Sequence, residues 1–167
     1  MSLIEAKLPA SLLIAGFVLA PLSATYAQTP AAIAATGTVV LTLHAEGAQV
    51  YECKADASGK PARVFREPIA TLLADGKTVG RHYAGPNWEY SDGSAVVGKA
   101  AGNAPGATDK DIPWLKLEVV SQRGSGALSA ITTVQRINTA GGKLQGACDK
   151  PGAYQSVPYS ADYVFLR

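Results

Sequence analysis

The sequence is poor in the residues that most often carry catalysis or bind metals. Its 167 residues include two histidines, His44 and His82, two cysteines and one methionine. A three-histidine site cannot be assembled from two, and a zinc site needs more ligands at closer spacing than two distant cysteines provide. The Gly-x-Ser-x-Gly motif of serine hydrolases and the His-Glu-x-x-His motif of zinc proteases do not occur either. We therefore expect no metal site.

A large excess of one charge and a long apolar run are also lacking over most of the chain. Lys and Arg number 15 and Asp and Glu 13, which gives a formal charge of +2, and the basic residues are scattered. Nucleic-acid-binding proteins carry basic patches, so we expect no nucleic-acid partner. Beyond the opening segment no stretch reaches the ~20 apolar residues of a membrane helix. We expect no stable membrane span once that segment is cleaved.

The opening segment is the exception. Lys7 precedes an almost wholly apolar stretch, Leu8 to Leu22, and Thr25-Tyr26-Ala27 supplies the small-x-small pattern of a cleavage site. This order predicts a signal peptide over residues 1–27 and a periplasmic or secreted protein that starts at Gln28. A retained anchor is the alternative, although the apolar stretch is short for a spanning helix and contains prolines. Because ATP and reduced nicotinamides are scarce outside the cytoplasm, we expect no cofactor.

The two cysteines, Cys53 and Cys148, form an even pair in a chain that is expected to be exported. In an oxidising compartment such a pair is usually a disulfide, and with two cysteines its connectivity is unambiguous. Two separate buried thiols are the alternative. A bridge over so long a loop would stabilise the fold by ~2–4 kcal/mol.

Alternation of apolar and polar residues dominates the chain after a loose leader at residues 28–37. Turn signals at Glu46-Gly47, Asp75-Gly76 and Asp92-Gly93 divide it, and a long loop is expected over Lys99 to Pro113. After the opening segment, no stretch keeps the 3.6-residue period of an amphipathic helix. The pattern predicts a single all-β domain over residues 38–167, an antiparallel sandwich or small barrel of about eight or nine short strands. These expected strands are Val39 to His44, Gln49 to Lys54, Ile69 to Ala74, Lys77 to Tyr83, Trp88 to Tyr90, Ser94 to Gly98, Trp114 to Val120, Ala127 to Asn138 and Tyr159 to Leu166.

One segment gathers the residue types of a binding or catalytic site. Between Gly80 and Gly93 it holds His82, Trp88, Glu89 and Asp92. A histidine beside a carboxylate could act as a general base, and a tryptophan could stack on a sugar or another flat ligand. The structural alternative is that the tryptophan anchors the core, the histidine bonds a loop carbonyl and the aspartate serves the turn.

A further candidate ligand-binding residue is Arg136, which lies within an otherwise β-branched strand. A buried arginine needs a carboxylate partner, and Asp162 on the last strand is the candidate for a structural ion pair.

The chain also resembles a known family. The residues that carry the resemblance are Gln49-x-Tyr51-x-Cys53, His82-x-x-Gly85-Pro86-x-Trp88, Asp92-Gly93-Ser94, Ile112-x-Trp114-Leu115, Thr133-x-Gln135-Arg136-x-x-Thr139-x-Gly141-Gly142, Cys148 and Pro158-Tyr159-Ser160-Ala161-Asp162-Tyr163-x-Phe165. In this order they are similar to the exported family catalogued as domain of unknown function 3455. The resemblance implies a secreted or periplasmic protein, and it implies no established activity and no catalytic residues.

Together these observations predict an exported β-domain that is a non-catalytic ligand-binding or envelope-associated module. Its ligand would be a small molecule or a glycan. The alternative is a small hydrolase or lyase that uses His82 with an acidic neighbour, and the surroundings of His82 decide between the two.

Overall fold

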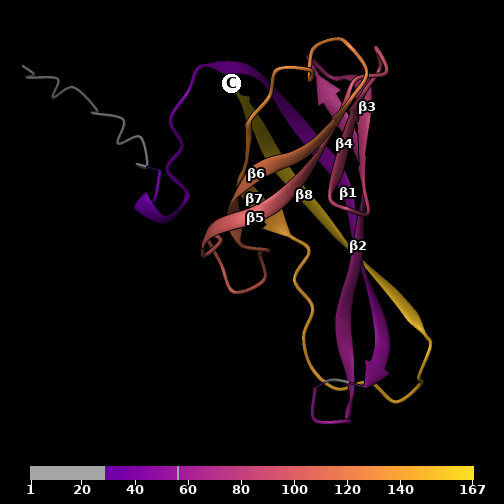
Figure 1. The fold of residues 1–167 in the computed structure, drawn as a ribbon. Coiled ribbons are helices and arrows are strands. Elements are labelled where there is room, and N and C mark those ends of the chain that lie inside the picture. Colours follow the sequence, from indigo (N-terminus) through magenta and orange to yellow (C-terminus); the bar gives the residue numbers. More distant parts are fainter. Residues whose placement is uncertain (1–28, 56) are drawn as a thin grey trace, which may run out of the picture.

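The computed structural model describes residues 29–55 and 57–167, which form a closed barrel of antiparallel strands (Figure 1). The predicted signal peptide over residues 1–27 lies outside the described residues and stays a prediction. Within the described part of the chain, no helix is long and apolar enough to cross a membrane.

Each strand pairs with the next one along the sequence, and the last pairs with the first. The chain is therefore an up-and-down barrel, which decides between the sandwich and the barrel that the sequence left open. The strands are β1 (Val39–Ala55), β2 (Pro61–Ala74), β3 (Lys77–Tyr83), β4 (Asn87–Tyr90), β5 (Ala95–Ala104), β6 (Trp114–Arg123), β7 (Thr133–Gly141) and β8 (Tyr154–Leu166).

The two strongest turn signals of the sequence both form hairpins. Asp75 and Gly76 join β2 to β3 with positive φ angles of 49° and 73°, the left-handed conformation that a two-residue type I′ turn requires. The turn at Asp92-Gly93 joins β4 to β5, and Gly93 also has a positive φ of 85°. Both predicted hairpins are confirmed.

The turn predicted at Glu46-Gly47 is wrong, because β1 runs through it without interruption. A Cβ atom on Gly47 would lie 2.1 Å from the carbonyl oxygen of Ile69. The glycine therefore allows β2 to approach β1 closely instead of turning the chain. β1, β2 and β8 have 17, 14 and 13 residues, longer than the short strands expected.

Two further boundaries differ from the prediction. β5 continues to Ala104, so the long loop covers residues 105–113. Residues 127–132 form a loop before β7 instead of the start of a strand. Side chains from the turn between β4 and β5 hold the backbone of this loop. Asp92 accepts a hydrogen bond from the Ala127 amide at 2.7 Å, and the Ser94 hydroxyl accepts one from the Leu128 amide at 3.1 Å. Such long-range bonds leave no local signal in the sequence.

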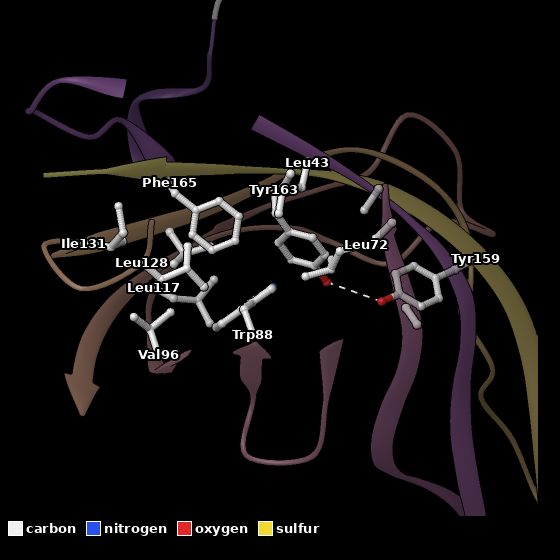
Figure 2. Close-up of a cluster of buried hydrophobic side chains, with 14 of the residues drawn as sticks. Leu43, Leu72, Trp88, Val96, Leu117, Leu128, Ile131, Tyr159, Tyr163 and Phe165 are labelled. Atoms are coloured by element: carbon white, nitrogen blue, oxygen red, sulfur yellow. Dashed lines mark hydrogen bonds between the residues drawn. The ribbon is translucent and has the colours of Figure 1, made fainter. Parts of the chain in front are cut away.

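At one end of the barrel the inward-facing side chains are large and apolar. Figure 2 shows this packed end, where Trp88 and Phe165 lie edge to face with ring centroids 6.3 Å apart. Leu128 and Ile131, from the loop before β7, are fully buried against the same cluster. The face predicted for β8 is confirmed, since Tyr159, Ala161, Tyr163 and Phe165 are all buried.

At the opposite end, β1 and β2 extend beyond the rest of the barrel with the start of β8 beside them (Figure 1). The predicted disulfide between Cys53 and Cys148 is present and joins β1 to the loop that leads to β8. We call the end at which β1, β2 and β8 extend beyond the other strands the open end.

Part of the segment expected as a loose leader packs against the barrel, at Ile33. Residues 31–33 form a single 3-10 turn, η1 (Ala31–Ile33), and Ile33 is fully buried. The side-chain amide of Gln135 donates a hydrogen bond to the Ile33 carbonyl at 2.7 Å. Residue 28 lies outside the described residues.

Candidate ligand-binding cavity

A cavity of about 1280 Å³ occupies the open end of the barrel. Barrels of eight strands have an interior that side chains fill or that holds one small ligand. Here the inward positions of β5 after Val96 are small, Gly98 and Ala100, so this part of the interior stays hollow. The cavity is lined by residues of the strands and of two loops, at residues 105–113 and 143–145.

Three aromatic rings, of which two are stacked and the third is tilted against them, separate the cavity from the packed end. His82 and Trp88, paired across β3 and β4, stack with centroids 4.6 Å apart and an interplanar angle of 13°. Tyr163 lies 4.9 Å from the His82 ring and 5.3 Å from the Trp88 ring. All three residues line the cavity, so they form a rigid aromatic floor for whatever enters it.

His82 is buried and held as a neutral ring. Its Nδ1 atom lies 2.7 Å from the Asn87 carbonyl oxygen, and because a carbonyl can only accept, Nδ1 carries the proton and Nε2 is an acceptor. Burial lowers the pKa of His82 to about 3, outweighing the opposing effect of that hydrogen bond. A general base works best with a pKa near the working pH, and His82 is far from that range.

The acidic neighbours proposed for His82 lie elsewhere. Successive residues of a strand point to opposite faces, so Glu89, which follows the inward Trp88, faces outward. There it accepts hydrogen bonds from Arg81 at 3.0 Å, Tyr83 at 2.9 Å and Arg123 at 2.7 Å. Bonding to Tyr83, chiefly, holds the pKa of Glu89 below its usual value.

Asp92 is equally remote from the cavity. Besides holding Ala127, its carboxylate accepts hydrogen bonds from the amide and hydroxyl groups of Ser94, at 2.8 Å and 2.5 Å. These bonds, the Ser94 hydroxyl first, lower the pKa of Asp92. The pairing of His82 with Glu89 or Asp92 as a general base is therefore wrong, and both acids are structural.

Arg136 lines the cavity, but the ion pair predicted with Asp162 is wrong. Arg136 is the cross-strand partner of Tyr163, and Asp162 is one residue away on β8, so the two side chains leave opposite faces of the sheet. Asp162 instead contacts His44 at 2.8 Å and accepts a hydrogen bond from Asn138 at 2.9 Å. The Arg136 guanidinium donates through Nε and Nη2 to the carbonyl of Pro113, at 3.1 Å and 2.8 Å.

Two buried side chains that line the same cavity as Arg136 carry N–H groups without a partner. They are the Nε2 amide of Gln49 and the Nε1 indole of Trp88, which are 2 % and 1 % exposed. Figure 2 shows the hydroxyls of Tyr159 and Tyr163 turned toward each other, 3.4 Å apart. Burial raises the pKa of both phenols, so these hydroxyls keep their protons. Buried polar groups are normally hydrogen-bonded, so unpartnered donors at a cavity need an explanation.

Sequence reasoning missed the residues from β1 and β8. Gln49, Tyr51 and Tyr163 all line the cavity, and the available signal was a polar atom on an inward position of an otherwise apolar strand. Tyr51 is satisfied, since its hydroxyl donates to the Gly142 carbonyl at 2.8 Å.

The rim of the cavity is mainly basic. Arg63, Arg66, Lys99 and Lys143 line it together with two acids, Asp109 and Asp111. Asp111 is used internally: it accepts hydrogen bonds from the Gly141 amide at 2.6 Å and from the amide and hydroxyl of Thr108 at 2.8 Å. Among the described residues no group of three or more His, Cys, Asp or Glu could hold a metal ion.

Comparison with known proteins identifies a family. The model of the family described as protein of unknown function, DUF3455, matches residues 34–167, which include the whole barrel. The resemblance drawn from the sequence motifs is therefore confirmed. No curated protein and no solved structure matches the chain.

Proposed function

We propose that this chain, which belongs to the DUF3455 family of proteins of unknown function, is a non-catalytic binding protein that holds one small amphipathic molecule inside its barrel. The observation that carries this proposal is the 1280 Å³ cavity with a preformed aromatic floor. Ligand sites are concave and largely apolar, with a few convergent polar groups that fix orientation. Trp88, Tyr163 and Phe65 supply the apolar wall, and Arg136 and Gln49 supply the polar groups.

We further propose that the protein works in the periplasm or outside the cell. Two observations support this. The first is the predicted signal peptide over residues 1–27, and the second is the disulfide between Cys53 and Cys148, a bond that persists mainly in oxidising compartments.

Binding inside the barrel can be tested by filling the cavity. Leu115 on β6 lines it, whereas Val120 on the same strand is 59 % exposed. The probe is N-phenyl-1-naphthylamine, a neutral molecule whose fluorescence rises in apolar surroundings. We expect the unmodified protein to bind it, Leu115→Trp to weaken binding at least about tenfold, which is ~1.4 kcal/mol, and the matched Val120→Trp variant to bind like the unmodified protein.

Thermal melts of both tryptophan variants show whether the barrel is still folded. Absence of any probe binding by the unmodified protein, or equal binding by both variants when folded, would rule out an internal binding site.

A further inference from the structure

The charge inside the cavity is unbalanced. Among the described residues no carboxylate lies within 4 Å of the Arg136 guanidinium, since every recorded ion pair involves other residues. Its hydrogen bonds to the Pro113 carbonyl position the group but do not neutralise it. A charge that is partly removed from water is costly unless it is paired. The guanidinium therefore favours a counter-charge that the described part of the chain does not provide.

Two other side chains that line this cavity also carry donors without a partner. Gln49 Nε2 and Trp88 Nε1 are buried N–H groups without a partner. Tyr163, the cross-strand partner of Arg136, has its ring 5.3 Å from that of Trp88. Because Trp88, Tyr163 and Arg136 line the same cavity, one small molecule on the aromatic floor could thus reach the guanidinium. A positive charge without a counter-charge, beside free guanidinium donors, calls for an acceptor with a negative charge.

The geometry of the arginine indicates which anion. A guanidinium has five N–H donors in a planar fork, and the Pro113 carbonyl uses only the edge with Nε and one hydrogen of Nη2. The end-on edge of the fork, with Nη1 and the rest of Nη2, can form the paired bonds that a carboxylate, sulfonate or phosphate accepts.

We propose that the bound molecule carries a single oxyanion group, which pairs with Arg136, while its apolar or aromatic body lies on the floor formed by Trp88, His82 and Tyr163. This inference rests on the proposed function and deepens it, because it names the chemical class of the ligand. The cations of the rim have a different role. Lys99 and Lys143 are exposed, so their attraction for an anion is long-range and screened by salt.

The test uses two probes that share one apolar scaffold and differ in charge. 8-Anilinonaphthalene-1-sulfonate carries the oxyanion, and N-phenyl-1-naphthylamine lacks it. We expect the unmodified protein to bind the sulfonate more tightly. Arg136→Gln should weaken sulfonate binding by about 10- to 100-fold, the range of a hydrogen bond to a charged group, and leave binding of the neutral probe within about twofold. Arg136→Lys keeps the charge without the fork and should be intermediate.

The controls separate the possible failures. Arg123→Gln removes a cation on the outer face, where Arg123 pairs with Glu89, and should leave binding of both probes unchanged. If Arg136→Gln weakens both probes equally, the arginine is merely structural and the inference is wrong. If Lys99→Gln and high salt weaken sulfonate binding as much as Arg136→Gln does, the anion sits at the rim and the inference is also wrong. If neither probe binds the unmodified protein, the proposed function itself fails.

Discussion

The packed end and the open end of this barrel are built on the same strands, and they differ in what those strands turn inward. β5 presents Val96 to the packed end and Gly98 to the cavity, and β7 presents Val134 and then Arg136. The order in which the strands pair is the same at both ends of the barrel. One antiparallel meander can therefore provide a stable core and a hollow site side by side, because the size of each inward-facing side chain determines whether the interior is filled at that level.

The largest expected effect comes from emptying the packed end. Phe165 is fully buried against Trp88, whereas Phe65 lines the open end and is 48 % exposed. We expect Phe165→Ala to lower the free energy of unfolding by about 3–5 kcal/mol and Phe65→Ala to lower it by less than about 1 kcal/mol. Urea denaturation of both variants measures the difference, and equal losses would mean that the two ends are not distinct.

A second effect concerns the boundary between the two ends. The unfolded chain protonates His82 near pH 6.5, whereas the folded chain resists protonation until about pH 3. The unfolded state therefore binds more protons between these values, and the free energy of unfolding falls as the pH falls through this window. Its slope approaches about 1.4 kcal/mol per pH unit, or about 2 kcal/mol between pH 6.5 and 5.

The matched control for this pH dependence is His82→Gln, which removes the titrating group. Urea unfolding at several pH values should give a much flatter profile for this variant between about pH 5 and pH 6.5. The carboxylates of Glu89, Asp92 and Asp111 have lowered pKa values and titrate below this window. An unchanged slope in the variant would show that His82 is not the buried proton acceptor.

The smallest expected effect lies outside the barrel. Glu89 pairs with Arg81 and Arg123 on an exposed surface, where ion pairs contribute about 0–1 kcal/mol. We expect Glu89→Gln to change the free energy of unfolding by less than about 1 kcal/mol and to leave binding of both naphthylamine probes unchanged. A large loss of binding would instead place Glu89 in the site and contradict the inside–outside distinction.

Local signals in the sequence were enough for most of the fold. Period-2 alternation located part of each of the eight strands, although it divided β1 in two and missed the first half of β2. The Asp-Gly pairs located two hairpins. The closure of the barrel by β1 and β8 was not predictable, because it joins residues such as Val39 and Leu166 at the two ends of the domain. The same holds for Gly47, whose role depends on how closely β2 approaches.

The candidate site was only partly predictable for a related reason. His82, Trp88 and Arg136 line the cavity, and strand alternation alone could have excluded Glu89 as a neighbour of His82. What the sequence could not supply is the meeting of β1, β7 and β8 around one volume. Gln49 looks like any polar strand residue until its unpartnered amide is found beside that volume.

The extension of β1, β2 and β8 beyond the closed part has a consequence for self-association. Among the strands of the described residues, β2 pairs only with β1 over residues 61–69, and β8 pairs only with β1 over residues 154–158. Unpaired edges of this kind can recruit strands from other molecules. Pro68 and Pro158 lie on them and cannot donate to a new strand. The Arg63 amide donates to the Gly146 carbonyl at 3.0 Å, in the loop that the disulfide tethers, so this loop occupies part of the β2 edge and leaves less of it free for a strand from another molecule.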